Sequence, residues 1–401
     1  MEKLTYFQQL QQTYHKEIIG VMDFWTKYGV DREYGGYLTC LDREGKVFGT
    51  DKSGWFQGRG LYTFSKAYNS VEKRPEWLEA ARLGYEFLKK HCYDNDKRMF
   101  FVLTRDGKPV QKRRYYFSEC FAVTGCAEYF KASGDTEALE LARDTFETIM
   151  YLYENPKVLP PKYNPEVVRT KSLNIPMIII ATAQVLCEAD PENKAGYDEI
   201  VSRLFKEIVT DFLKEDAKAL FETVGQNGER LDTPAGRTIN PGHSIEASWF
   251  LMHEAILKGD IGLLEKSLDI LNWSFEIGWD KQYGGLMYFM DIDGRPSDKL
   301  EWDMKLWWPH CEALIAFLMA YKATGDEKYL ERFKQVHDYT FPHFKDKEFG
   351  EWYGYLHRDG SVSNHLKGNL FKGPFHIPRA LILCDLMLKD ICEYGVMGGS
   401  V

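Results

Sequence analysis

One pattern recurs along the chain and constrains its fold more than any other feature. It is a short segment with an acidic or lysine-containing start, aromatic and β-forming residues, and a turn that ends in glycine. Five copies occur, at Asp31–Gly45, Asp96–Gly107, Lys218–Gly228, Lys281–Gly294 and Lys347–Gly360. Each copy is typical of a small β-hairpin, because glycine supplies the positive φ that the turn needs.

The spacing of these copies indicates a repeat. They start 65, 122, 63 and 66 residues apart. Since the second interval is about twice the others, we infer a sixth unit whose hairpin is replaced by the proline-rich loop Asn155–Pro165. Self-similarity at a fixed interval is the mark of an array of supersecondary units.

Between the hairpins, apolar residues recur every three or four positions, which predicts α-helices. One set comprises Trp77–His91, Thr136–Tyr153, Tyr197–Leu213, Leu263–Ile277 and Glu327–Tyr339. A second set precedes these helices and is rich in alanine and small residues, as in helices buried on both sides: Gly58–Ser70, Tyr116–Ala132, Leu173–Ala189, His243–Lys258 and Trp307–Ala323. Two pairs are joined by Gly-Asp, in which the glycine ends one helix and the aspartate caps the next.

With an opening helix at Leu4–Tyr28 and a closing helix at Phe375–Leu388, the count is about twelve helices in six pairs. Six repeats could also form an open solenoid, but its terminal repeats need polar outer faces, and Phe375–Leu388 is too apolar for that role. We therefore predict an all-α (α/α)6 barrel, a toroid with short β-hairpin loops. Residues 1–401 are expected to form a single domain.

Composition excludes several classes of function. The net charge of −9 argues against nucleic acid and against an anionic membrane as partner. The first residues carry no apolar leader, and no stretch reaches 18 apolar residues, so we expect neither secretion nor a membrane span. The eight cysteines are scattered without a CxxC pair, which is typical of reduced thiols in a cytoplasm.

Polar residues that do not fit a buried helix cluster in the first turns of the second helix set and of the closing helix. They are Arg59, Tyr116, Ser118, Glu119, Asn174, His243, Glu246, Trp308, His310, Glu312, His376 and Arg379. In a toroid whose inner helices run the same way, these starts converge at one end of the central cavity. Helix N-termini add partial positive charge there, which suits an anionic intermediate.

Each of these residues also has a purely structural interpretation. Arg59 could pair with Glu119, His243 could pair with Glu246 at i, i+3, and a lone His376 could be structural. Of the two adjacent tryptophans, we interpret Trp308 as a site residue and Trp307 as core. The coincidence of such residues on all six helices favours a site, because polar core residues placed at random would not all fall in first turns.

The sequence lacks the motifs of several other chemistries. It has no GxxxxGK[ST] and no GxGxxG after a strand, so no nucleotide loop is predicted. It has no HExxH, and its histidine spacings give no chelating pair, so no metal is predicted.

Six segments resemble the N-acylglucosamine 2-epimerase family, also known as renin-binding proteins. They are YGGYLTCLDREG, WFQGRG, SLNIPMIII, NPGHSIEASWFL, KLWWPHCEALIA and FKGPFHIPRAL, which span nearly the whole chain in order. The resemblance implies an (α/α)6 barrel in which Arg59, His243 and His376 are the essential arginine and the two catalytic histidines. It implies that Glu246 and Glu312 are supporting carboxylates. Some family members need ATP as an activator without consuming it, and no motif here decides that requirement.

We therefore expect C2 epimerisation of an N-acylated amino sugar, between N-acetylglucosamine and N-acetylmannosamine, with no cofactor for the chemistry. Two groups must exchange a proton on opposite faces of the open-chain sugar, and histidine titrates near neutral pH. Arg59 would stabilise the enediolate oxygen. Glu246 would set the tautomer of His243, and His310 would help to open the ring or hold a hydroxyl group.

The acylamino group needs its own contacts, and we expect Asn174 to supply a polar partner and Met177 an apolar wall. Three alternatives stay open. The chain could be an epimerase or an aldose–ketose isomerase that acts on an unsubstituted aldose or a cellobiose-type disaccharide. The chain could be a glycoside hydrolase that uses two of Glu119, Glu246 and Glu312. It could also be a binding scaffold without turnover. The expected partner is a small sugar, and a homodimer is allowed.

Overall fold

The computed structural model describes residues 2–164 and 166–396, and helices dominate it. The long helices are α1 (Glu2–Tyr28), α2 (Gly54–Ser70), α3 (Pro75–His91), α4 (Phe117–Ser133), α5 (Thr136–Glu154), α6 (Asn174–Ala189), α7 (Lys194–Glu207), α9 (Pro241–Lys258), α10 (Ile261–Gly278), α11 (Trp307–Thr324), α12 (Glu327–Phe344) and α13 (His376–Tyr394). α8 (Pro234–Arg237) is a single turn. No helix in the described ranges is long and apolar enough to cross a bilayer.

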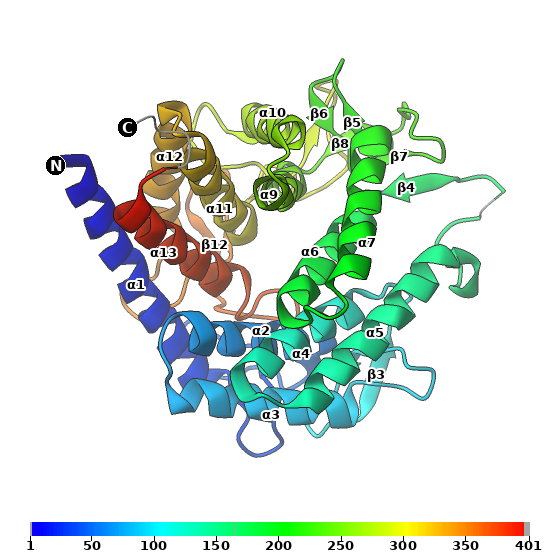
Figure 1. The fold of residues 1–401 in the computed structure, drawn as a ribbon, viewed down its shortest axis with the longest axis vertical. Coiled ribbons are helices and arrows are strands. Elements are labelled where there is room, and N and C mark those ends of the chain that lie inside the picture. Colours follow the sequence, from blue (N-terminus) through cyan, green and yellow to red (C-terminus); the bar gives the residue numbers. More distant parts are fainter. Residues whose placement is uncertain (1, 165, 397–401) are drawn as a thin grey trace.

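The long helices form two concentric rings (Figure 1). The inner ring is α2, α4, α6, α9, α11 and α13, and each of these helices contacts the next. The outer helices α3, α5, α7, α10 and α12 pack on the inner helices that precede them, and α1 packs on α13. Because α13 contacts both α11 and α2, the ring is closed, which confirms the predicted (α/α)6 toroid over an open solenoid.

The inner helices are buried because they are covered on both sides. In α4 every residue from Ser118 to Tyr129 is buried, and in α11 every residue from Trp307 to Leu318 is buried. α2 and α4 also approach each other closely through two glycines. A Cβ on Gly58 would lie 2.4 Å from the backbone carbon of Phe121, and one on Gly125 would lie 2.5 Å from the carbonyl oxygen of Gly58. Only glycine allows this backbone approach.

The predicted connections between inner and outer helices are confirmed at two places. Gly134 and Gly325 follow α4 and α11 in the left-handed conformation. Asp135 and Asp326 then cap α5 and α12 by accepting a hydrogen bond from the backbone N–H two residues on. One predicted helix changes its winding. The predicted segment Tyr197–Leu213 is α-helical as far as Glu207, continues as a π-helix at Ile208–Phe212, and reaches a strand at Leu213.

Short antiparallel strands lie in the loops at one end of the ring. They are β1 (Lys52–Ser53), β2 (Phe100–Leu103), β3 (Pro109–Lys112), β4 (Thr170–Ser172), β5 (Leu213–Lys214), β6 (Ala219–Leu220), β7 (Thr223–Gly225), β8 (Thr238–Ile239), β9 (Met290–Asp291), β10 (Lys305–Leu306), β11 (Tyr355–Leu356) and β12 (Val362–Asn364). They pair as β1-β2-β3, β10-β11-β12, β4-β7, β5-β6 and β8-β9. The final glycine of each of the five predicted hairpins has the positive φ expected of it.

In the part of this loop that the structure describes, the sixth unit forms no hairpin of its own, as predicted. Its loop starts with a 3-10 turn at Pro156–Val158, and the predicted loop's last residue, Pro165, lies outside the described residues. The chain then enters β4, which pairs with β7 of the following unit.

Three of the hairpin loops are held by the same kind of ion triad, in which the aspartate and the lysine are buried and the arginine is partly exposed. The sequence patterns did not predict these triads. An aspartate at the start of one loop binds a fully buried lysine and the arginine of another loop. The triads are Asp31–Lys52–Arg105, Asp280–Lys305–Arg358 and Asp346–Lys367–Arg43. In the third triad, Arg43 of the first loop binds Asp346 of the last, so this triad joins the two ends of the repeat array.

Candidate active site

A cavity of about 820 Å³ runs along the axis of the toroid and is lined by all six inner helices. Its volume is in the range of small-molecule sites. Eight residues predicted from sequence line it: Arg59, Asn174, Met177, His243, Glu246, Trp308, His376 and Arg379. Polar residues from the first two turns of the inner helices therefore line one cavity, although the residues predicted on α4 are not among them.

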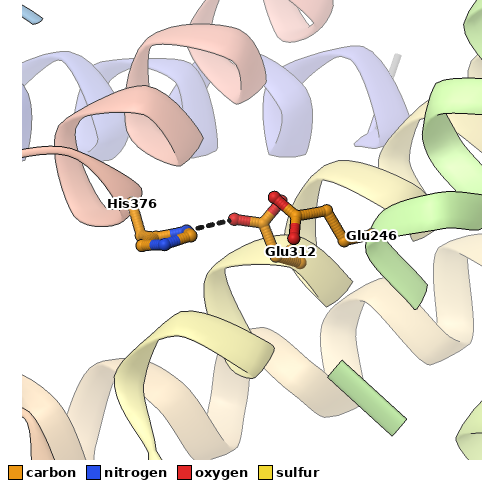
Figure 2. A group of neighbouring side chains, drawn as sticks. All are labelled: Glu246, Glu312 and His376. Atoms are coloured by element: carbon orange, nitrogen blue, oxygen red, sulfur yellow. Dashed lines mark hydrogen bonds and ion pairs between the residues drawn. The ribbon is translucent and has the colours of Figure 1, made fainter. Parts of the chain in front are cut away.

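His376 is the first residue of α13, and it belongs to a buried network of charged groups. Its Nδ1 lies 2.7 Å from Glu312 Oε1, which Figure 2 shows as a bond between α13 and α11. Arg379 donates from the same nitrogen to Glu312 (2.6 Å) and to Glu246 (2.7 Å). The other oxygen of Glu312 accepts from Trp249 Nε1 at 2.9 Å. These bonds join α9, α11 and α13 around one histidine.

The surroundings of His376 disfavour its protonation. Burial lowers its pKa well below the ordinary value, and the nearby guanidinium groups of Arg59 and Arg379 lower it further. Its first-turn position in α13 adds the positive end of a helix dipole. His376 is therefore a neutral imidazole at neutral pH.

His243 has a different partner from the one predicted. Both oxygens of Glu222 lie 3.0 Å from its Nδ1. Glu246 instead binds Arg379, so the prediction that Glu246 sets the tautomer of His243 is wrong. Burial opposes protonation of His243, but the carboxylates of Glu222, Glu246 and Glu312 outweigh it and raise its pKa above the ordinary value.

Trp308 lies between the two histidines. Its ring centroid is 5.1 Å from that of His243 and 5.8 Å from that of His376. The prediction that Trp308 is a site residue is consistent with its place in the cavity wall, and Trp307, predicted as core, lines the same cavity.

Arg59 is a half-buried cation without an ionic partner among the described residues. Its guanidinium lies 3.9 Å from the ring centroid of Phe121 and 4.6 Å from that of Phe375, and among the described residues it makes no hydrogen bond or ion pair. Burial and the charge of Arg379 lower its pKa to about 9. An unpaired cation of this kind can form an ion pair with a negatively charged group of a bound molecule.

The suggested Arg59–Glu119 pair is wrong. Glu119 accepts hydrogen bonds from Arg98 Nε (2.6 Å) and from the backbone of Met99 (2.9 Å). It is fully buried against the hairpin of the second unit, and neither it nor the buried Tyr116 belongs to the cavity wall. The first turn of α4 packs on its own hairpin, which removes these two predicted site residues from the cavity.

His310 is also outside the cavity wall. Its Nδ1 donates to the carbonyl oxygen of Leu306 (2.6 Å), and its Nε2 accepts from the backbone N–H of Leu286 (2.9 Å). Its ring packs on Tyr339 and Phe344 of the outer helix α12. Burial lowers its pKa to about 3. The predicted role in opening the sugar ring is therefore wrong, because both ring nitrogens are used within the protein.

Glu246, Glu312 and His376 have the composition of a metal site, and their ligand atoms lie within 4.8 Å of one another (Figure 2). Sequence spacing could not reveal this group, because its members come from three helices. However, Arg379 already donates to an oxygen of each carboxylate. A metal ion would have to displace this guanidinium, so the group does not fit a metal as it stands.

Sequence reasoning missed Glu222. It lies between β6 and β7, in the hairpin of the third complete copy, and nothing in the local pattern FETVG separates it from an ordinary solvated hairpin residue. Its contact with His243 depends on how the hairpin packs on α9, which no local pattern records.

Known proteins match this chain over nearly its whole length. The family described as N-acylglucosamine 2-epimerase (GlcNAc 2-epimerase) matches residues 36–376. The chain is 41% identical to the N-acylglucosamine 2-epimerase of Bos taurus, over 94% of this chain and 90% of that protein. It is 27% identical to the cellobiose 2-epimerase of Ruminococcus albus, over 89% and 93% of the two chains. Among solved structures, cellobiose 2-epimerase from Bacillus thermoamylovorans B4167 superimposes with a TM-score of 0.83 at 22% identity, over 95% and 100% of the chains.

A closed helical toroid with this cavity, together with these relatives, defines an isomerase of the sugar-epimerase class. Within that class, the chain belongs to the N-acylglucosamine 2-epimerase family.

Proposed function

We propose that this isomerase interconverts N-acetylglucosamine and N-acetylmannosamine by moving a proton at C2 between His376 and His243. The observation that carries the proposal is the environment of the two rings. Both line one cavity from helices two pairs apart, and each is anchored through Nδ1 to a carboxylate. Nε2 of either ring makes no hydrogen bond to a described residue, so both nitrogens are available to a sugar.

The reaction needs the open-chain aldehyde, whose carbonyl acidifies the proton on C2. Neutral His376 takes that proton at Nε2, and the electron pair of the C–H bond moves through C1 to the carbonyl oxygen. Protonated His243 then returns a proton to the other face of C2, and the electrons return to re-form the carbonyl. The low pKa of His376 and the raised pKa of His243 support this division of roles for one direction. The reverse direction exchanges them.

The anionic oxygen at C1 needs stabilisation while C2 is planar. Arg59 is the cation available for it, since its charge is not neutralised by any described carboxylate. Stabilisation of charge that exists only in the transition state is usually the largest contribution of a preorganised site.

The acylamino substrate is supported by the relatives and by α6. The chain is 41% identical to an N-acylglucosamine 2-epimerase but only 27% identical to a cellobiose 2-epimerase. Asn174 and Met177 lie on successive turns of α6 and line the cavity, and Asn174 Oδ1 accepts no hydrogen bond from a described residue. We assign Asn174 to the amide and Met177 to the methyl group.

The test is incubation with N-acetylmannosamine, N-acetylglucosamine, mannose and cellobiose in D2O, followed by NMR of the C2 epimers and of deuterium at C2. We expect N-acetylmannosamine to exceed mannose at least about tenfold in kcat/KM, or about 1.4 kcal/mol for one contact. Faster turnover of mannose or cellobiose would place the enzyme in the alternative substrate class. If no sugar is turned over, the alternative of a binding scaffold without catalysis is favoured.

The proposed chemistry uses no cofactor and no metal. Parallel reactions with ATP and with a chelator test this, and turnover that depends on neither is the expected result. ATP dependence would mark a nucleotide as an activator, and loss of activity with the chelator would overturn the assignment of Glu246 and Glu312 to Arg379.

A further inference from the structure

The residue that distinguishes the two histidines does not lie on a helix. Glu222 follows β6 and precedes β7, and its position is fixed by three backbone interactions. Its carbonyl oxygen accepts from Leu173 N at 3.0 Å, the N–H of Phe221 donates to Phe212 at 3.0 Å, and Thr223 pairs with Ser172 across β4 and β7. The hairpin therefore holds Glu222 at the junction of α6 and α9.

The carboxylate of Glu222 is dedicated to His243. Both of its oxygens lie 3.0 Å from Nδ1, and its side chain is only 16% exposed. Among the described residues it contacts no lysine or arginine. The corresponding carboxylate of His376, Glu312, also binds Arg379, so its charge is shared with a permanent cation.

Other charged groups near His243 also influence its protonation. Glu246, one turn along α9, and Glu312, on α11, also favour protonation of His243, but both are bonded to Arg379. On α13, His376 is neutral and adds no charge. The cations Arg59 and Arg379 line the same cavity, but neither forms an ion pair with Glu222, whose carboxylate is bonded to His243.

We propose that Glu222 is a positioning residue that holds the Nδ1–H form of His243 and keeps the ring protonated, so that Nε2 is the proton donor at C2. This inference rests on the proposed function. It makes the third hairpin part of the active site and explains how two chemically identical side chains enter the reaction in different protonation states. A residue that fixes a histidine in this way acts through it, as carboxylates do in other catalytic sites.

The experiment compares Glu222→Gln with Glu229→Gln in the full-length protein. Glu229 is an exposed residue of the same hairpin, so its substitution removes the same charge without touching His243. Glutamine keeps the shape of Glu222 but loses the charge. We expect the pKa of His243, measured by NMR of its labelled ring, to fall in Glu222→Gln and to stay unchanged in Glu229→Gln.

Kinetics should follow the same order. Glu222→Gln should lower kcat at least about tenfold, the low end for an outer partner of a site histidine, with little change in KM. The alkaline limb of the kcat/KM profile should move to lower pH, because the donor loses its proton earlier. Glu222→Asp, which keeps the charge, should recover part of the loss.

The outcomes separate this inference from the proposed function. If the pKa of His243 and kcat are both unchanged in Glu222→Gln, Glu222 has no positioning role. If the pKa falls while His243→Ala retains turnover, the pairing is supported and the two-histidine reaction is overturned. A thermal transition in Glu222→Gln that matches the Glu229→Gln control shows that a kinetic loss is not unfolding.

Discussion

His243 and His376 are both in first turns of inner helices, yet their neighbours give them opposite tendencies. His376 is held neutral by burial and by two arginines, whereas carboxylates raise the pKa of His243. Changing either residue to alanine should reduce turnover at least about a hundredfold, the low end for general acid–base catalysis. Steady-state assays with N-acetylmannosamine measure this. Near-normal turnover in either variant would contradict the assignment.

Arg59 supplies a charge without a partner, and its expected role is confined to the transition state. Arg59→Lys keeps the charge but loses the planar donor geometry. It should lower kcat more than it raises KM, because binding of the neutral sugar uses the charge less than the anionic intermediate does. The two constants are separated in a substrate titration. A change in KM alone would make Arg59 a residue for substrate binding.

At the scale of elements, the hairpin loops connect the helices and also fix their positions through side-chain contacts. The turn after α10 is connected to α11 by the hydrogen bond from Leu286 N–H to His310 Nε2, and the ring of His310 packs on α12. His310 therefore joins the loop after α10 to α11 and α12. These contacts hold its ring outside the cavity wall, although Trp308, two residues earlier, belongs to that wall.

His310→Ala should separate stability from catalysis. It removes a buried ring and leaves the N–H of Leu286 without a partner, a loss of roughly 2–5 kcal/mol in the free energy of unfolding. Denaturant titration should show this loss, while kcat at a temperature well below the transition stays within a few-fold of the unmodified protein. The reverse pattern, normal stability with lost turnover, would return His310 to the reaction.

At the scale of the whole molecule, the last repeat must meet the first. α13 contacts α2 and is covered by α1, and Arg43 in the first loop binds Asp346 in the last at 2.8 and 3.1 Å. Because the two ends of the chain complete one ring, we propose that it is a single domain, and we expect one cooperative thermal transition. Two separate transitions in calorimetry would argue for two domains.

Asp346→Asn tests the triad Asp346–Lys367–Arg43, which joins the first and last hairpin loops. Asp346 also binds the fully buried Lys367, so the substitution leaves a buried ammonium group without its counter-ion. Breaking one partner of a buried pair costs about 3–5 kcal/mol. The thermal transition should fall as a single step. Asp359→Asn, on an exposed turn of the same hairpin, is the control and should leave it unchanged.

The three triads also predict the response to acid. Burial opposes ionisation of their aspartates, but the paired lysines and arginines outweigh it and lower the pKa of Asp31 and Asp280 to about 2, and that of Asp346 further. An aspartate in the unfolded chain titrates near about 3.9. Since the folded pKa values are depressed, this stability is complete above about pH 4 and is lost as the pH falls towards 2. Unfolding midpoints measured across this range should show the loss, and Asp31→Asn should make the dependence shallower.

Local patterns in the sequence were enough to predict the helices, their pairing, the glycine turns and the helix starts that carry His243 and His376. Arg59 was expected in a first turn, but α2 begins four residues earlier than predicted, at Gly54. Helical periodicity and turn chemistry act over a few residues, so these features can be read along the chain.

Tertiary structure decided which side chains meet. Glu246 is a neighbour of His243 on one helix, yet it binds Arg379 on another, and Glu222 takes its place from a hairpin. Glu119 binds Arg98 in the adjoining hairpin, and His310 contacts the loop after α10 and the outer helix α12. Arg43 binds Asp346, which lies 303 residues further along the chain. Such pairs depend on the rotation of each helix and on ring closure, and both are set by packing between segments distant in sequence.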